Sequence, residues 1–274
     1  MGIEVAWHDT VVSRLEELNI NVNEALYGKF RLLVFEYKTL VVHLISLNSN
    51  HDAAVLINLQ AQYSERGVNL IHLWEDVWAA RQGQVLSRIQ SLLGLNQRIH
   101  ARKTKVISVS KPLAEEFLEA NHIQSYASSR YRVGLKLDEK LVALACFSNL
   151  RVMKKEGVGT YKSAEVIRFA SLAGYTVMGG FTKLLKHFIA KFGPDDIMSY
   201  ADRDWSNGKV YEQAGFELVD ITPPSIIYLK TDTLVRYFPH RLPSSGILPL
   251  HNVNNNTNFV EIFNTGNLKY IYTI

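Results

Sequence analysis

The sequence has a single cysteine in 274 residues and no long apolar run. Because one thiol, Cys146, allows neither a disulfide framework nor a cysteine-rich zinc site, we expect a reducing, cytoplasmic compartment. No stretch approaches the ~20 apolar residues that a membrane-spanning helix needs, so we expect no membrane partner. The first residues lack a basic segment followed by an apolar one and carry acidic side chains, which argues against a signal or transit peptide.

The overall composition excludes an intrinsically disordered chain. Hydrophobic residues make up 47% of the sequence, which is enough for real cores, and the length suits two domains. Thirty Lys and Arg against 26 Asp and Glu give a formal charge of +4, which permits an anionic partner without requiring one. No internal repeat is visible, and we interpret the Asn-rich tract at residues 252–258 as an exposed loop.

The first hundred residues show the pattern of an α/β domain. Helical spacing of apolar residues predicts helices, and short β-branched runs predict buried strands. Gly67 and Gly94 follow two of the helices as natural C-caps. The predicted order is a helix, two strands, a helix, a strand and a helix, over residues 3–18, 31–35, 39–47, 51–67, 68–74 and 79–94.

The second half begins with a predicted helix over residues 111–122, with Pro112 in its first turn. A hairpin over residues 132–147 turns at a polar Asp-Glu-Lys triplet. A strand, a helix, a strand, a helix closed by Gly215 and a final strand or strand pair follow up to residue 230. We place domain limits at residues 1–100 and 101–232, with a C-terminal extension over 233–274 that packs on the second domain.

Residues 101–230 resemble the GNAT-like, acetyltransferase-fold domain of phage-type proteins that join it to a Vsr-like or PD-(D/E)XK nuclease domain. The matching segments include EVIRFAS, TVMGGFTKLLKHF and SYADRDWSNGKVYEQAGF, and the tail EIFNTGNLKYIY is similar to their closing motif. The resemblance implies an α/β (α+β) chain, in which a restriction-endonuclease-like domain precedes a GNAT-like acyltransferase domain. The most specific of these segments is SYADRDWSNG.

The nuclease half is expected to be degenerate. Its pattern GVNLIHLWEDVWAARQGQVLSRIQSLLG resembles the last strand and helix of such nucleases, which need an Asp and a Glu on adjacent strands to hold a divalent cation. Leu32 and His43 stand at those places, so we predict no metal site. A Glu-x-Lys triplet at Glu36 keeps nuclease activity open, and Glu75 and Asp76 are either ligands or an exposed strand end.

A glycine turn opens the helix after residue 178. Backbone N–H groups and the helix dipole at such a start can hold a pyrophosphate, and a lysine nearby adds positive charge. The resemblance implies acetyl-CoA or another acyl-CoA as the cofactor. The alternative is a strand-to-helix turn that needs glycine for its conformation or for close packing. The predicted cofactor-binding residues are Met178, Gly179, Gly180, Phe181, Thr182 and Lys183.

Three residues are candidates for acid–base catalysis. The resemblance implies that Tyr211 protonates the departing CoA thiolate, and a phenol with a pKa near 10 suits that role. The alternative is that Tyr211 packs with Phe216 in the core. Asp202 and Asp204 follow a predicted buried strand, where ligands of α/β sheets bind, and either could deprotonate an amine.

The predicted substrate-binding residues are Arg168, Trp205, Ser206 and Asn207. Arg168 interrupts an apolar strand, so it must face a cleft or pair with an acid, for which an aspartate of the segment SYADRD is the alternative. The alternative for Ser206 or Asn207 is that one of them caps the next helix. His122 either contacts substrate or closes a helix, and we expect Cys146 in the core.

Basic residues form a candidate nucleic-acid surface. A stripe of this kind binds a phosphate backbone if its members share a face, and otherwise they are separate solvated groups. The predicted nucleic-acid residues are Arg98, Arg102, Lys103, Lys105, Arg130 and Arg132. The favoured function is an acyl-CoA-dependent N-acyltransferase whose acceptor is a DNA base, or a protein or small amine. The alternatives are a catalytically silent DNA-binding protein and a metal-dependent DNA endonuclease.

Overall fold

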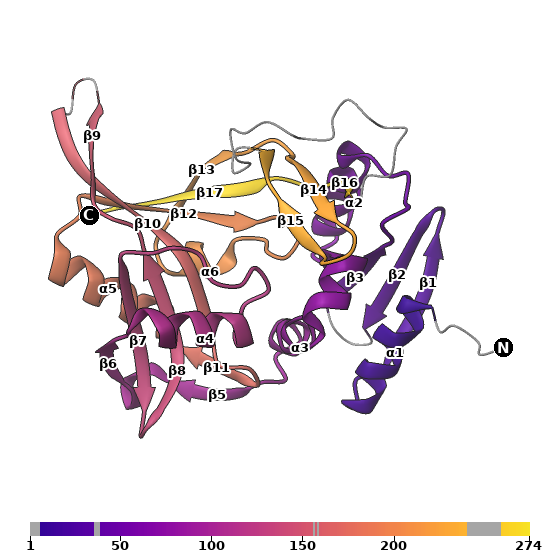
Figure 1. Ribbon diagram of the computed structural model, residues 1–274, viewed down its shortest axis with the longest axis horizontal. Helices are drawn as coiled ribbons and strands as arrows, with labels where there is room; N and C mark the ends of the chain where they lie inside the picture. Colours follow the sequence, from indigo (N-terminus) through magenta and orange to yellow (C-terminus); the bar gives the residue numbers. More distant parts are fainter. Residues whose placement is uncertain (1–5, 36–38, 156, 158, 240–258) are drawn as a thin grey trace. The chain divides into compact units, whose positions relative to one another are not determined.

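A computed structural model describes residues 6–35, 39–155, 157, 159–239 and 259–274 (Figure 1). The chain forms two compact units. Unit 1 comprises Met1–Ala80, Asp202–Asn207 and Thr222–Asn267, and unit 2 comprises Arg81–Ala201, Gly208–Ile221 and Leu268–Ile274. Compact units need not fold independently, so the three predicted domains stay a prediction. The Glu36 triplet and the Asn-rich tract fall outside the described residues.

Unit 1 contains a four-stranded sheet in the order β1-β2-β3-β4, with β3 and β4 parallel and the other neighbours antiparallel. Because parallel strands need a crossover, helix α2 connects β3 to β4. Asp52 caps α2 by accepting a hydrogen bond from the Val55 N–H at 2.8 Å. The strands are β1 (Val22–Tyr27), β2 (Phe30–Phe35), β3 (Leu40–Ile45) and β4 (Asn69–Trp74), and α2 is Ala53–Glu65.

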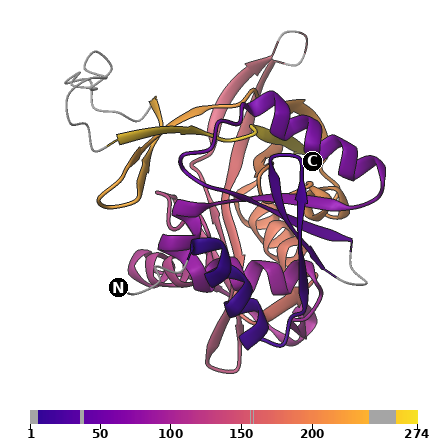
Figure 2. The ribbon, with the colours of Figure 1, turned by 90° about the vertical axis from the view of Figure 1, so that its right-hand side faces the viewer.

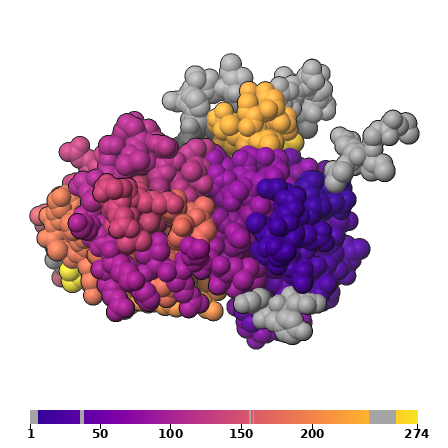
Figure 3. Space-filling model, turned by 90° about the horizontal axis from the view of Figure 1, so that it is seen from below, coloured from indigo at the N-terminus to yellow at the C-terminus, as the bar shows by residue number. Residues whose placement is uncertain are grey.

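One face of this sheet is covered by α2, with Leu59 packed against Leu32, Val41 and Leu70. Strand β1 was not predicted, because its sequence VNEALY has no regular apolar pattern; five of its six residues are exposed. Figure 3 shows this N-terminal part of the chain, in indigo, at the surface.

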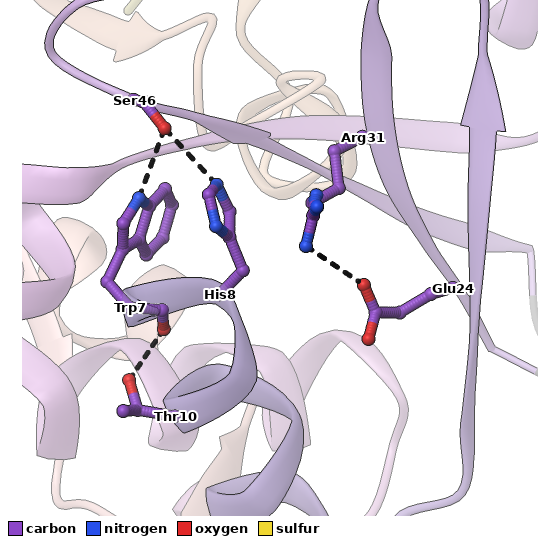
Figure 4. A network of polar contacts seen from close by, with 6 residues as sticks. All are labelled: Trp7, His8, Thr10, Glu24, Arg31 and Ser46. Carbon is purple, nitrogen blue, oxygen red and sulfur yellow. Dashed lines mark hydrogen bonds and ion pairs between the residues drawn. The ribbon is translucent and has the colours of Figure 1, made fainter. Parts of the chain in front are cut away.

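The first side chains of helix α1 (Trp7–Glu17) contact Ser46, which follows the last residue of strand β3 (Figure 4). Trp7 Nε1 donates to Ser46 Oγ at 3.1 Å, and His8 Nε2 lies 3.2 Å from the same hydroxyl. Thr10 Oγ1 donates to the Trp7 carbonyl at 2.6 Å and accepts from Trp78 Nε1 at 2.8 Å. These contacts fix α1 to the rest of unit 1.

Unit 1 also contains a small sheet from the second half of the chain. Its order is β15-β14-β16, with both pairs antiparallel. Ile227, Leu229 and Ile262 are its buried residues. The strands are β14 (Ile226–Lys230), β15 (Val235–Tyr237) and β16 (Phe259–Phe263).

Unit 2 is built on an eight-stranded sheet whose main path is β13-β17-β12-β10-β8-β7-β6, with β9 paired to β10. Strand β9 and the first part of β10 form a two-stranded arm (Figures 1 and 2). The strands are β6 (Lys105–Ser108), β7 (Tyr131–Leu137), β8 (Lys140–Phe147), β9 (Arg151–Lys155), β10 (Gly159–Ser171), β12 (Asp196–Asp202), β13 (Glu217–Ile221) and β17 (Asn267–Thr273).

Helices cover both faces of this sheet, as the alternation of side chains along β8 requires. Helix α5 (Gly180–Phe192) packs on the face that carries Ala145 and Phe147. Helix α4 (Lys111–Asn121) packs on the opposite face, with Cys146. Cys146 is therefore a core residue, as predicted, and burial raises the pKa of its thiol.

The remaining elements of the described chain connect these layers. Helix α3 (Glu75–Leu92) has one non-helical residue, Arg81, at the limit between the two units. Strand β5 (Gln97–His100) pairs in parallel with β11 (Tyr175–Met178). The other elements are the short helices η1 (Ala101–Lys103) and α6 (Lys209–Gln213).

The elements predicted after residue 100 occur in the predicted order, namely helix, hairpin, strand, helix, strand, helix and strand. Strand β6 precedes them, β9 and β11 lie between them, and these three strands were not predicted. Among the helices that the structure describes, none is both long enough and apolar enough to cross a bilayer.

Candidate functional site

Two central strands of unit 2 stop pairing partway along their length. Strands β10 and β12 pair in parallel from Ser163 with Asp196 to Val166 with Ser199. On its other side β10 stays paired with β8, but the register shifts between Val166 and Arg168. Backbone groups beyond the end of a ladder need other partners. The end of this ladder is therefore a place where the sheet can accept a ligand.

Tyr211, from α6, is hydrogen-bonded at this point. Its Oη lies 3.0 Å from Ser199 Oγ, which lies 3.1 Å from the Val166 carbonyl oxygen. Ser199 has one hydroxyl proton and a carbonyl can only accept, so both contacts are satisfied when Ser199 donates to Val166 and Tyr211 donates to Ser199. Burial raises the pKa of Tyr211, against the opposing effects of Ser199, Arg168 and Arg88, so the phenol keeps its proton at neutral pH.

The ring of Tyr211 is held by aromatic neighbours. It stacks on Tyr270 with ring centroids 5.2 Å apart and makes edge contacts with Phe181 and Phe216, each at 5.5 Å. The predicted packing with Phe216 is therefore present. It does not compete with a chemical role, because the hydroxyl end of the ring has its own polar partner.

Helix α6 begins after Gly208, not after Ser206 or Asn207, so the prediction that one of those two caps the helix is wrong. Gly208 has a φ of 80°, and a Cβ there would lie 1.8 Å from Tyr270 Oη. Only glycine fits this close approach. The hydroxyl of Tyr270 in turn donates to Glu212 Oε1 at 3.0 Å.

The glycine turn before α5 has a structural reason for each glycine. Gly179 is the N-cap with a φ of 71°, and a Cβ on Gly180 would lie 2.9 Å from Val177 Cγ1. No side chain caps this helix start in the described chain. Its first N–H groups, on Gly180, Phe181 and Thr182, are thus placed where an anion could accept from them.

Lys183 lies in the first turn of α5 and is partly buried. Its ammonium donates to the carbonyls of Ala101, at 2.9 Å, and Thr104, at 2.5 Å. The charge therefore stays near the helix start, while at least two of its three donors are used within the protein. The binding of a cofactor by Met178 and the five residues after it stays a prediction.

Arg168 is directed toward backbone carbonyls of unit 2. Its Nε donates to the Ser125 carbonyl at 3.1 Å, and one terminal nitrogen donates to the Ile167 carbonyl at 2.8 Å. His122 is the C-cap of α4, which matches the alternative predicted for it, and its Nδ1 accepts from the Gln124 N–H at 3.0 Å. Burial, with Arg168 and Arg88 nearby, lowers the pKa of His122 to about 3, so the ring is neutral.

Asp204 belongs to unit 1 and is buried there. Its carboxylate accepts from Thr265 twice, from the N–H at 3.0 Å and from Oγ1 at 2.6 Å. Its backbone carbonyl accepts from the His72 N–H at 2.8 Å. Burial raises the pKa of Asp204, and the bonds from Thr265 oppose that shift. This residue joins distant segments of unit 1 to one another.

The other predicted residues of this segment lie in the same unit. Asp202 Oδ1 accepts from the Asp204 N–H at 3.0 Å, Trp205 is buried, and Asn207 is exposed. Ser206 is half-buried. The structure thus groups these side chains in unit 1, and it groups Tyr211 with Arg168 in unit 2. Their catalytic and substrate-binding roles stay predictions.

The positions that align with nuclease ligands are in the core of unit 1. Leu32 and His43 are register partners on β2 and β3, and both are buried. Asp76 does not lie at an exposed strand end: it lies in the first turn of α3, is buried, and accepts two hydrogen bonds from Arg236, of 2.6 and 2.8 Å. Glu75 accepts from a backbone N–H. Across the described ranges, no three His, Cys, Asp or Glu side chains are arranged to hold a metal ion.

The predicted nucleic-acid residues differ in their surroundings. Arg132 is engaged with the protein, because its guanidinium donates to the carbonyls of Val109, at 3.2 Å, and Ser129, at 2.7 Å. Arg130, Arg132 and Lys191 line a shallow pocket of about 160 Å³. Nothing in these positions favours DNA over another anion. The exposed members of the set are Arg98, Arg102, Lys103, Lys105 and Arg130.

Sequence reasoning missed Arg88 and Ser199. Arg88 belongs to a helix whose charged residues are typical of a solvated face. Its positive charge nevertheless lowers the pKa of Tyr211 and that of His122. Ser199 is the small polar residue of an apolar strand, SYA, and is fully buried. A buried hydroxyl needs a partner, so Ser199 could have been noticed from its position in a buried strand.

No protein-family model matches this chain, and a search of curated proteins found no match. Among solved structures, it is similar to the ribosomal-protein-S18-alanine N-acetyltransferase of Escherichia coli, with 17% identity over 62% of this chain and 94% of that one and a TM-score of 0.38. A GNAT family acetyltransferase from Elizabethkingia anophelis with acetyl-CoA bound matches with 15% identity over 63% and 99%, at a TM-score of 0.39.

An acetyltransferase from Bacillus subtilis in complex with CoA matches with 11% identity over 63% of this chain and 99% of that one, at a TM-score of 0.37. TM-scores below 0.5 do not establish a common fold. The order of elements and the contacts of Tyr211 therefore carry more weight than these similarities.

Proposed function

We propose that unit 2 is a GNAT-like, acyl-CoA-dependent N-acyltransferase. The observation that carries this proposal is the end of the parallel β10–β12 ladder at Val166 and Ser199, with the protonated phenol of Tyr211 bound to Ser199 at the same point. The order of helices and strands around these two strands, which is that of the N-acetyltransferase resemblance, supports it further.

The residues around this point fit an acyl-CoA. The pairing of β10 with β12 ends at Val166, so the backbone amides of β10 beyond that residue are suited to the amide-containing arm of the cofactor. The first turn of α5, after Gly179 and Gly180, offers N–H groups to the pyrophosphate. Lys183 adds positive charge there. When bound, the cofactor supplies a thioester carbonyl as the electrophile.

The chemistry balances with Tyr211 as the acid. An acyl-CoA bound here would supply a thioester carbonyl to the acceptor amine, and the C–N bond would form as the C–S bond breaks. Tyr211 would donate its proton to the thiolate leaving group, the nitrogen would lose a proton to solvent, and the phenolate would be reprotonated from solvent. Asp202 and Asp204 are predicted bases, but their described contacts are structural, so no step is assigned to them.

Calorimetry with acetyl-CoA tests the proposal. We expect one molecule to bind per chain with a dissociation constant in the range of about 1 µM to 1 mM. The Tyr211→Phe variant should bind it equally well, because the phenol acts on the leaving group only. The matched control is Tyr161→Phe, on the β9–β10 arm. An absence of heat at millimolar acetyl-CoA would contradict the assignment.

A further inference from the structure

A shallow pocket lies at the corner of the unit 2 sheet where strand β6 ends. Strand β6 pairs with β7 up to Ser108, opposite Val133, whereas β7 itself begins at Tyr131. The last two residues of α5, Lys191 and Phe192, line the same pocket. Its volume is about 160 Å³. Strands β6 and β7 and the end of α5, all of unit 2, thus enclose it together.

Three positive side chains line this pocket, and no acidic residue of the described chain does. Arg130 directly precedes β7, Arg132 lies on β7, and Lys191 lies in the last turn of α5. No ion pair between described residues includes any of the three. A lysine in the last turn also stabilises the helix dipole, but that role does not require two arginines of another element to line the same pocket.

One of the three cations is held in place by the backbone. The guanidinium of Arg132 donates to the Val109 carbonyl at 3.2 Å and to the Ser129 carbonyl at 2.7 Å. These bonds use two of its five N–H donors, so others remain for a ligand. Arg132 is half-buried, whereas Arg130 and Lys191 are exposed and can move toward a bound anion.

The remaining wall of the pocket is apolar. Val109 and Val133 are both buried, and the half-buried ring of Phe192 packs against Tyr131 with centroids 4.1 Å apart. The ammonium of Lys191 lies 5.5 Å from the centroid of the Phe192 ring. Apolar groups beside charges lower the local dielectric constant, which strengthens the attraction between these cations and an anion.

We propose that this pocket binds the phosphate group of a small molecule. A phosphate monoester carries a charge near −2 and three acceptor oxygens around a tetrahedral centre, so cations from three directions can each reach an oxygen. The two oxygens of a carboxylate, by contrast, are satisfied by one planar guanidinium. A pocket that encloses a whole ligand measures roughly 300 to 1,000 Å³, so only the phosphate enters this one and the rest of the molecule lies outside.

The pocket is separate from the cofactor site proposed above. Helix α5 has 13 residues, so its two ends lie about 20 Å apart. The pyrophosphate is proposed at the start of this helix, and the pocket lies at its end. A single ribose joins the pyrophosphate of CoA to its third phosphate, so one CoA cannot occupy both places. The phosphate site therefore does not depend on the acyltransferase function.

Calorimetry with inorganic phosphate tests the site, on the full chain and at constant ionic strength. We expect phosphate to bind about tenfold more tightly than acetate, because it engages more than one cation. Arg130→Gln and Lys191→Gln should each weaken phosphate binding about fivefold, since each removes one exposed charge. Both side chains are exposed, so the melting temperature should not change.

The matched control is Lys105→Gln. Lys105 is an exposed cation at the other end of β6, outside the pocket, so its loss should leave phosphate binding unchanged. An absence of heat at millimolar phosphate, equal binding of acetate, or an equal loss in Lys105→Gln would each overturn the proposal. A DNA duplex that binds more tightly than phosphate and is weakened by the same two variants would also overturn it, in favour of a surface for polyanions.

The same titration is repeated with saturating acetyl-CoA, so that the two proposals fail separately. Phosphate binding that is unchanged by acetyl-CoA supports a separate site. If acetyl-CoA displaces the phosphate and Arg130→Gln weakens acetyl-CoA binding, the pocket belongs to the cofactor and the proposal is wrong. If acetyl-CoA does not bind but phosphate does, the acyltransferase function is wrong while the phosphate site stands.

Discussion

The two units each contain a cluster of polar groups, and the two clusters differ in the groups that surround their titratable side chains. In unit 1 the Asp76 carboxylate meets the guanidinium of Arg236, and the Asp204 carboxylate takes two bonds from Thr265. In unit 2 the guanidiniums of Arg88 and Arg168 lower the pKa of His122, and they oppose the rise that burial causes in the pKa of Tyr211. Both His122 and Tyr211 are neutral.

This difference separates a structural network from a candidate site. Acids paired with donors inside the protein hold segments together and leave little for a ligand. In unit 2 the phenol of Tyr211 keeps its proton and is hydrogen-bonded to Ser199, so it is suited to act as an acid. The segment SYADRDWSNG was the most specific part of the sequence resemblance. The contacts of its Asp204, however, hold distant segments of unit 1 together.

The largest expected effect is on the network of unit 1. Replacing Arg236 by Met leaves the Asp76 carboxylate, 2% exposed, without its partner, which should lower the free energy of unfolding by about 3 kcal/mol. Tryptophan fluorescence during urea unfolding reports on this unit alone, because every tryptophan belongs to it: Trp7, Trp74, Trp78 and Trp205.

The control for that change is Lys230→Met, which removes an ion pair with Asp232 whose side chains are 34% and 47% exposed. It should cost less than about 1 kcal/mol. Equal losses in the two variants would show that Asp76 and Arg236 are not a buried network.

The next effect concerns the support of Tyr211 in unit 2. Gly208→Ala places a Cβ 1.8 Å from Tyr270 Oη at a φ of 80°, so we expect a loss of about 3 kcal/mol from steric overlap and backbone strain. Gly193→Ala is the matched control, since its φ is also positive and its Cβ would meet open space. Circular dichroism during heating compares them, and similar melting temperatures would contradict the close approach.

Removing the hydroxyl of Tyr211 tests whether this residue of unit 2 acts as the acid. Tyr211→Phe should lower kcat by about 100-fold with acetyl-CoA binding unchanged, because only the leaving group loses its acid. Burial raises the pKa of Tyr211, so the wild-type activity should persist to alkaline pH and fall only above its ordinary value near 10. The measurement is CoA thiol release across pH, and an unaltered kcat in the variant would exclude Tyr211 as the acid.

The smallest effect comes from two buried histidines of unit 1. Burial lowers the pKa of His43 to about 2 and that of His72 to about 3, below the unfolded value of about 6.5. The folded state therefore binds fewer protons, so stability is complete above pH 6.5 and falls below it by about 1.4 kcal/mol per pH unit for each histidine.

His43→Leu tests this dependence in the same fluorescence assay. It should reduce the loss of stability between pH 7 and pH 5.5 by about 1.4 kcal/mol, because one of the two histidines no longer takes up a proton on unfolding. An unchanged loss would mean that His43 is not held neutral by burial.

Local patterns predicted most of the helices and strands but not their grouping. The apolar periods of α4, α5 and the β7–β8 hairpin are strong, so these elements were found close to their observed limits. Strand β1 has no such pattern, and its pairing with β2 is what defines it. The assignment of Asp202–Asn207 to unit 1 depends on Thr265 and His72, which lie far away in the sequence.

The candidate site was predictable to a similar extent. Tyr211 and Arg168 stand out, the first by its motif and the second as a charge in an apolar strand. Arg88 does not stand out, because the sequence of an amphipathic helix does not predict which residues of other elements a basic side chain will contact. The paired role of Asp76 required knowledge of Arg236, which is 160 residues away in the sequence.

Hydrogen exchange with and without acetyl-CoA tests the central claim most directly. We predict that acetyl-CoA slows exchange in β10 beyond Val166, in β12 up to Ala201 and in the first turn of α5, all of unit 2. Exchange in strands β1 to β4 of unit 1 should be unchanged. Protection that is absent, or that is confined to unit 1, would contradict the account.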